Sequence, residues 1–270
     1  MKNEERSQGR GTVRSRTVAT TVLMVATFMD LMDSTITNVA LPTIGKDLHA
    51  TPEQLEWTIA GYVIAFATLL ITGGRLGDIF GHRRIFVIGI VGFTLASLGA
   101  ALSQTGDLLV AARVLQGGFA AIMMPQVLSS VQVMYAPEER APVLGIIGSL
   151  SALGAVGGLI LGGWLVTANL LGMGWRSIFL VNVPVGVVLA AAALLFVPRS
   201  RSEHPLRPDL VGVLLGGLGV FLVVFPLTDG RAAGWAWWIW AMLLAAPLVI
   251  AAFTWQQRHM LKVHGSPLLP

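Results

Sequence analysis

Long apolar runs alternate with short polar segments along the whole chain. A helix that crosses a bilayer needs about 20 predominantly apolar residues, and eight runs meet this criterion. The pattern therefore predicts an all-α, polytopic membrane protein, with Pro42 ending the first span. The predicted spans cover residues 17–41, 55–76, 85–102, 108–135, 141–167, 177–197, 210–227 and 237–255.

Composition indicates the same class of protein. Hydrophobic residues make up 54% of the 270 residues and charged residues only 12%, whereas a soluble domain carries about 25% charged residues. Cysteine is absent, which excludes a disulfide framework and a thiolate metal site. The net charge of +4 does not predict a nucleic-acid partner, because the basic residues come in short clusters between apolar runs, as topology signals do.

These basic clusters predict the orientation of the chain in the bilayer. With a cytoplasmic N-terminus, the outer loops hold only Lys46, Arg176 and Arg231, and the positive-inside rule is obeyed. We therefore expect a multi-pass protein of the cell membrane, of the bacterial inner-membrane type, with the lipid bilayer as a partner. The basic residues expected in cytoplasmic segments are Lys2, Arg6, Arg10, Arg14, Arg16, Arg75, Arg83, Arg84, Arg140, Arg199, Arg201, Arg207, Arg258 and Lys262.

Polar segments divide the chain into five parts. Residues 1–16 are predicted to form a cytoplasmic N-terminal tail, and residues 17–197 a bundle of six spanning helices. A basic, proline-rich linker over residues 198–208 follows on the cytoplasmic side. Two further spanning helices are expected over residues 209–256, and a short cytoplasmic end over residues 257–270.

Asp30 and Asp33 lie three residues apart late in the first apolar run, a spacing that places them on one face of a helix. An ionisable group inside a spanning helix costs about 2.5–3.5 kcal/mol on insertion scales and normally faces a pathway or a partner. We interpret the pair as functional and expect it to share a proton, because close carboxylates do not both ionise easily. A structural pair, hydrogen-bonded to Thr35, Thr37 or another helix, is the alternative.

The second span runs into a glycine-rich polar segment over residues 73–84. Its glycines favour a tight turn and a close approach of helices. Asp78 can form a charge cluster with Arg83 and Arg84, whereas the alternative is a basic loop that only sets topology.

This segment resembles the signature loop between helices two and three of the major facilitator superfamily, motif A. The resemblance implies a conformational gate. His82 replaces a base of the motif, which would make the gate pH-sensitive if the imidazole titrates. Ile79 also replaces a base. The residues that match or extend the motif are Gly74, Leu76, Asp78, Gly81, Arg83 and Arg84.

Further segments narrow the resemblance to the fourteen-span drug:proton antiporters. The first-helix motif of that family is matched around Asp33, whereas Asp30 lies outside it. Residues 113–118 look like motif B of the fourth helix, and residues 175–186 are similar to the segment that opens the sixth helix. Asp209 with the seventh span, and Gly234 with Trp235, resemble the two extra central helices. The residues that carry the first two matches include Asp33, Thr35, Asn38, Pro42, Arg113 and Gln116.

Arg113 admits two interpretations. It lies near the start of a span, so its side chain could snorkel to the interface. In the family that the chain resembles, the motif B arginine instead faces the interior and acts on a nearby acid during proton exchange.

The fifth span carries Gly154, Gly158 and Gly162 four residues apart, on one face. Small residues at this spacing let helices pack closely. Motif C of the antiporters lies here and reads Gly-Pro in mid-helix, whereas this chain has Gly158 followed by Leu159. The departure removes a site that favours a kink.

The resemblance implies a six-helix bundle of two inverted three-helix repeats, plus two further helices. It also implies multidrug efflux, the export of amphipathic, often cationic, compounds in exchange for protons. A metabolite permease and a non-transporting membrane interaction protein are the alternatives. The proton-coupling or substrate candidates are Asp33, Asp30, Arg113, Asn38 and Gln116.

No nucleophile or metalloprotease motif and no P-loop occur, so we predict neither an enzyme nor a cofactor, and the proton gradient is the expected energy source. Small amphipathic substrates and protons are the expected partners. The family has a second six-helix bundle after the central pair. We therefore expect a truncated chain, a half that pairs with a second polypeptide, or a non-transporting remnant.

Overall fold

The computed structural model describes residues 2–169, 172–200, 210–231 and 233–264. Within these residues the secondary structure is helical, with no strand. Eight helical segments are long and apolar enough to cross a membrane, which confirms the predicted all-α fold class. The helices are α1 (Lys2–Leu48), α2 (Pro52–Phe80), α3 (His82–Ala101), α4 (Gly106–Met134), α5 (Pro137–Ala168), α6 (Ser177–Leu180), α7 (Asn182–Phe196), α8 (Leu210–Asp229) and α9 (Trp237–His264). A 3₁₀ turn over Gly174–Arg176 precedes α6, and this turn, α6 and α7 together form one span, Gly174–Phe196.

The prediction that Pro42 ends the first span is wrong, because α1 continues through this proline to Leu48. Proline removes only one backbone hydrogen bond, and packed neighbours let membrane helices tolerate that loss. Ile44, in the turn after the proline, is completely buried in a cluster with Trp175 and Phe179. Burial of this turn therefore keeps the helix intact beyond the proline.

The two ends of the chain are helical where they are described. Residues 2–16, predicted as a cytoplasmic tail, are continuous with α1, and α9 extends to His264, into the predicted cytoplasmic end. The side of the membrane on which the two ends lie stays a prediction. Residues 201–208 of the predicted linker, and residues 265–270, lie outside the described residues. Among the basic residues of the topology prediction, Arg201 and Arg207 lie there too.

Local sequence signals explain where several helices begin. Thr51 caps α2: its hydroxyl accepts a hydrogen bond from the Gln54 backbone N–H (3.2 Å), and the Gln54 side chain accepts one from the Thr51 N–H (3.0 Å). This reciprocal pair satisfies donors that the first turn of a helix leaves free. At the start of α4, the Thr105 hydroxyl accepts from the Leu108 N–H at 3.3 Å.

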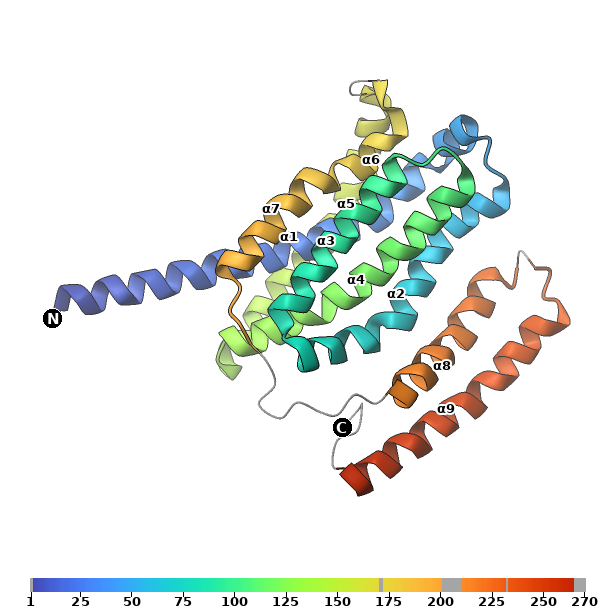
Figure 1. The fold of residues 1–270 in the computed structure, drawn as a ribbon. Helices are drawn as coiled ribbons and strands as arrows, with labels where there is room; N and C mark the ends of the chain where they lie inside the picture. Colours follow the sequence, from blue (N-terminus) through green and yellow to red (C-terminus); the bar gives the residue numbers. More distant parts are fainter. Residues whose placement is uncertain (1, 170–171, 201–209, 232, 265–270) are drawn as a thin grey trace.

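The first six spans form one bundle, and α8 and α9 form a hairpin beside it (Figure 1). Within the bundle, α4 packs against α2 and α3, α1 packs against α5, and α8 joins the hairpin to α2. Arg16 pairs with Glu139 at one end of the bundle, at 2.5 Å. At the other end, Asp47 accepts hydrogen bonds from Trp175 Nε1 (2.9 Å) and Arg176 Nη1 (2.5 Å). These contacts fix the ends of the bundle around a long apolar core.

Glycine allows the close contact between α2 and α4. A Cβ atom at Gly73 would stand 2.3 Å from the Ala121 carbonyl oxygen and 2.7 Å from the Ile122 Cα. Real side chains do not approach backbone atoms this closely, so any larger residue would force the two helices apart.

We predict that Gly73→Ala lowers the free energy of unfolding by about 1–3 kcal/mol, the usual cost of overpacking. The measurement is thermal unfolding of the purified protein in detergent. Gly163→Ala is the matched control, because no atom lies within 4 Å of a Cβ built at that position of α5 and alanine has the higher helix propensity. Equal destabilisation by both substitutions would contradict the assignment of the effect to the α2–α4 contact.

Candidate functional site

A buried polar network surrounds Asp33 in the middle of the bundle. It comprises Asp33 on α1, Ser97 on α3, Arg113 and Gln116 on α4, and Asn182 on α7, and we call it the Asp33 network. All five side chains are at most 1% exposed. Four helices thus direct polar groups to one point inside otherwise apolar spans.

The Asp33 carboxylate accepts three hydrogen bonds from this network. Arg113 Nη1 donates to Oδ2 at 2.6 Å. The Gln116 amide donates to Oδ1 at 2.9 Å, and the Asn182 amide donates to the same oxygen at 2.6 Å. A charge-assisted bond and two amide donors stabilise an ionised carboxylate, and a buried ion pair needs such additional hydrogen bonds to offset its desolvation.

Arg113 faces the interior of the bundle rather than a helix end. Its Nε donates to the Thr58 carbonyl oxygen at 3.0 Å, and its Nη1 also donates to Gln116 Oε1 at 2.5 Å. The guanidinium carbon lies 4.4 Å from the centre of the Tyr62 ring and 5.8 Å from that of Phe179. Of the two sequence-based interpretations, the structure therefore places Arg113 in the interior position.

Asp30 is 5% exposed and lies next to this network with a different partner. The Tyr62 hydroxyl donates to Asp30 Oδ1 at 2.5 Å, and the Tyr62 ring carries the Arg113 guanidinium on its face. Both acids are thus connected to Arg113. Asp33 pairs with the guanidinium directly, whereas Asp30 accepts a hydrogen bond from Tyr62, whose ring packs against the guanidinium. Among the described residues, this buried region contains two carboxylates and one guanidinium.

Two members of the network are not singled out by the sequence alone. Asn182 lies in the sixth-helix segment over residues 175–186. The signal that could have identified it as a member of the network is an amide side chain deep in an apolar run. Its Oδ1 is buried and has no hydrogen-bond partner among the described residues. Ser97 gives no such signal. Its hydroxyl donates to the Phe93 carbonyl oxygen (2.8 Å) and accepts from Gln116 (2.8 Å).

The structure does not bring Asn38 into the Asp33 network. Asn38 is exposed, and its amide donates to the Ser34 carbonyl oxygen at 3.0 Å. The Thr35 and Thr37 hydroxyls also bond to carbonyl oxygens of α1 and not to the carboxylates. Successive side chains on an α-helix are rotated by about 100° about its axis. A motif residue close to Asp33 in the sequence can therefore point away from the Asp33 network.

The glycine-rich segment forms a one-residue turn at Gly81, between α2 and α3. Its φ of 96° lies in the region that favours glycine. The prediction that Asp78 forms a charge cluster with Arg83 and Arg84 is wrong, because Asp78 has other partners. Asp78 lies 3.8 Å from Arg75 and 3.7 Å from His82. Arg83 instead donates to the Leu194 carbonyl oxygen of α7 at 3.0 Å, because the tight turn directs it across the bundle.

Gln126 of α4 holds this end of α2 in place. Its amide donates to the Gly73 carbonyl oxygen at 2.7 Å, and its Oε1 lies 2.9 Å from His82 Nδ1. A Cβ at Gly77 would stand 2.0 Å from the same Oε1, whereas one at Gly74 would meet only Pro125, at 3.7 Å. Gly77, outside the matched motif positions, is therefore the residue that leaves room for Gln126.

The glycine face of α5 packs on α1 directly beside the acids. A Cβ at Gly158 would stand 2.0 Å from the Thr35 hydroxyl, and one at Gly162 would stand 2.7 Å from Ile36. Gly154 lies against the Phe28 carbonyl oxygen, at 3.1 Å for a Cβ. The three glycines therefore let α5 approach the segment of α1 that carries Asp30 and Asp33.

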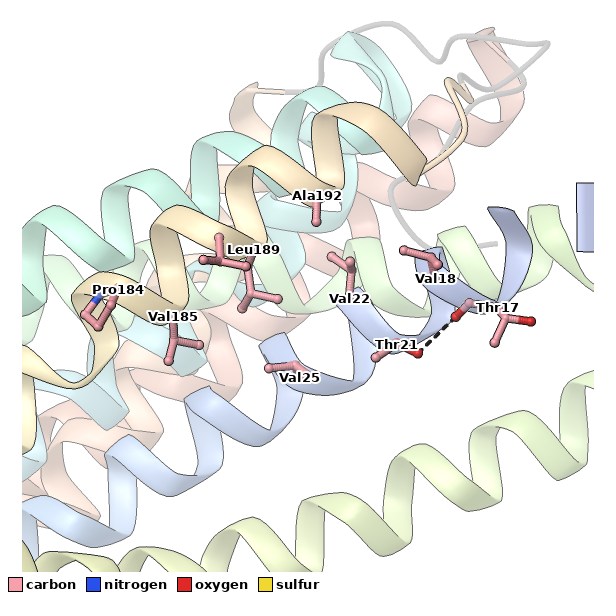
Figure 2. A pocket seen from close by; sticks show the side chains of 10 residues that line it. Thr17, Val18, Thr21, Val22, Val25, Pro184, Val185, Leu189 and Ala192 are labelled. Carbon is pink, nitrogen blue, oxygen red and sulfur yellow. Dashed lines mark hydrogen bonds between the residues drawn. The ribbon is translucent and has the colours of Figure 1, made fainter. Parts of the chain in front are cut away.

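A cavity of about 530 Å³ lies between α1 and α7 (Figure 2). Its lining is apolar except for two threonines, and the Thr21 hydroxyl already donates to the Thr17 carbonyl oxygen at 3.0 Å. The lining contains none of the predicted site residues, and it offers no charged group to a ligand. The lining residues are Thr17, Val18, Thr21, Val22, Val25, Pro184, Val185, Val188, Leu189 and Ala192.

Comparison with known proteins identifies the family. The family model described as Major Facilitator Superfamily matches residues 23–254. A probable actinorhodin transporter of Streptomyces coelicolor is 42% identical over 256 residues, which cover 94% of this chain and 44% of that protein. The tetracenomycin C resistance and export protein of Streptomyces glaucescens is 36% identical, over 94% of this chain and 45% of that protein.

The fold is also similar to that of a solved transporter. The crystal structure of a human organic anion transporter superposes with a TM-score of 0.62 at 13% identity, covering 80% of this chain and 56% of that one. At this identity the likeness shows the fold alone. The present chain spans about half the length of the curated relatives described above.

We predict strong coupling between the two charges of the buried ion pair. Arg113→Gln leaves the Asp33 carboxylate without its cation, and such a change costs about 3–5 kcal/mol of the free energy of unfolding. Asp33→Asn combined with Arg113→Gln removes both charges and keeps hydrogen-bonding groups, so it should lose less than the sum of the single changes. A double-mutant cycle on chemical unfolding in micelles measures this difference, and strictly additive losses would contradict the pairing.

Proposed function

We propose that this chain, which belongs to the Major Facilitator Superfamily, exports amphipathic, often cationic, compounds in exchange for protons. It is a multi-pass membrane protein. The proposal extends to its setting: the cell membrane, with the N-terminus in the cytoplasm, as the basic clusters predict.

The observation that carries the proposal is the buried set of two carboxylates and one guanidinium around Asp33. With both acids ionised, this set has a net negative charge inside an apolar bundle. Uptake of one proton leaves one carboxylate with one guanidinium, which is a neutral set. A buried region that becomes neutral on taking a proton can bind either a proton or a substrate cation, and competition between the two is the basis of antiport.

The geometry also suggests how one proton could affect several helices. Asp33 connects α1 to donors from α4 and α7. Protonation of its carboxylate would remove the charge that holds Arg113 and would convert an acceptor into a donor. The hydrogen bonds across these helices would then rearrange, and a local charge change coupled to helix packing is how such switches act.

The names of two relatives support export as the activity. These relatives are a probable actinorhodin transporter and a tetracenomycin C resistance and export protein. Because this chain covers less than half of each, export of such compounds by this protein is part of the proposal. The charge of the Asp33 network favours substrates with a positive group.

Asp33→Asn should abolish proton-driven exchange in the native protein carrying this sequence, because an amide cannot take up and release the proton. Inverted membrane vesicles provide the assay: addition of a cationic dye should release protons from the lumen in the unsubstituted protein, and not in the variant. Asp107→Asn is the matched control, because Asp107 is an exposed carboxylate in the first turn of α4.

Unchanged exchange in a folded Asp33→Asn variant would remove Asp33 from the mechanism. Proton-coupled uptake of a defined metabolite, with no movement of cationic dyes, would favour a permease instead. No transport by the unsubstituted protein would favour a membrane interaction protein. Equal loss in Asp33→Asn and Asp107→Asn would contradict a specific role for the buried acid.

A further inference from the structure

A cavity of about 510 Å³ lies beside the turn between α2 and α3, at the end of the bundle opposite the Asp47–Arg176 contact. Three arginines line it, and its described lining contains no acidic residue. The lining residues are Phe80, Gly81, Arg83, Arg84, Arg199 and Ser200.

Backbone contacts hold the two sides of this cavity together. The His82 N–H donates to the Ser200 carbonyl oxygen at 3.1 Å. Arg83 Nη1 donates to the carbonyl oxygens of Leu194 (3.0 Å) and Val197 (3.4 Å). A Cβ on Gly81 would stand 3.3 Å from the Ser200 oxygen, so glycine permits this approach. Segments more than 100 residues apart are thus joined into one cationic site.

The site has polar groups that the described part of the chain does not satisfy. The Ser200 hydroxyl oxygen is buried without a hydrogen-bond partner there. Arg84 and Arg199 form no ion pair with an acid among the described residues. Like charges repel when they gather, whereas an anion with several oxygens would offset the repulsion and bind guanidinium groups in a bidentate manner. A signal that only sets topology needs basic residues near a span but does not require their convergence on one cavity.

The position of the cavity indicates which anion it would meet. It lies where α2 ends, α3 begins and α7 has just ended. Because these helices belong to segments long enough to cross the bilayer, their ends lie at the depth of the lipid headgroups. Phe80, at its edge, is 53% exposed and presents an apolar ring beside the three cations. Basic cavities between spanning helices on the cytoplasmic side suit anionic headgroups.

We propose that this cavity binds the phosphate group of an anionic phospholipid, with Arg84 and Arg199 as the main contacts and the Ser200 hydroxyl as an additional donor. Arg83 positions the site through α7. This role goes beyond transport, because lipid binding requires neither substrate nor a proton gradient.

The test measures lipid binding by the purified full chain in detergent. Phosphatidylglycerol, phosphatidylcholine and inorganic phosphate are titrated separately, and bound lipid is counted by native mass spectrometry. Arg84→Gln and Arg199→Gln should each weaken phosphatidylglycerol binding about fivefold, the usual effect of one basic residue at an anionic surface. Ser200→Ala should weaken it about threefold, as for loss of one hydrogen bond.

Arg258→Gln is the matched control, because Arg258 is an exposed arginine of α9 outside the cavity. It should leave phosphatidylglycerol binding unchanged, and the unfolding midpoint without lipid should be the same in all four variants. Equal losses for Arg258→Gln and Arg199→Gln, or equal binding of phosphatidylcholine, would overturn the specific site. Displacement of the lipid by millimolar inorganic phosphate would assign the cavity to a soluble anion and overturn the lipid proposal.

Discussion

The contact between the Arg113 guanidinium and the Asp33 carboxylate is the interaction on which the interior of the bundle depends. At 2.6 Å and almost completely buried, the pair takes two charges out of water into spans of apolar residues. Removing either partner of a buried pair leaves an uncompensated charge, which is strongly destabilising. The amides of Gln116 and Asn182 complete the shell of donors around the carboxylate, and α1, α4 and α7 must stay in register for these bonds to exist.

Packing around this pair depends on the absence of side chains as much as on their presence. Gly154, Gly158 and Gly162 let α5 approach the α1 segment that carries both acids, and Gly73 and Gly77 let α4 approach α2. In a bilayer no hydrophobic effect draws helices together, so close van der Waals packing and internal hydrogen bonds supply the association. The same small residues therefore hold the acids at a fixed distance from their partners on neighbouring helices.

The spans could be predicted from the sequence because the bilayer imposes their length. A charge in an apolar run indicated that Asp33 faces the interior, and the resemblance to motif B indicated the same for Arg113; both side chains are buried and paired there. Partners were harder to predict. Asn182 and Ser97 join the network only through the packing of α7 and α3, whereas Asn38, a motif residue, points away from it. Arg83 contacts a carbonyl oxygen of α7 rather than Asp78. This partner depends on the direction in which the one-residue turn at Gly81 leads the chain, which the sequence alone does not give. The continuation of α1 past Pro42 likewise depends on burial of Ile44, which lies far from its neighbour Phe179 in the chain.

The proposed antiport depends on exchange of a proton for a substrate cation at the buried acids. Proton release on addition of tetraphenylphosphonium to the purified native protein, in weakly buffered detergent solution, measures this exchange without a membrane gradient. We expect binding of the cation to release protons from the unsubstituted protein, and Asp33→Asn to abolish the release. Binding of the cation with no proton release from the unsubstituted protein would contradict the proposed exchange.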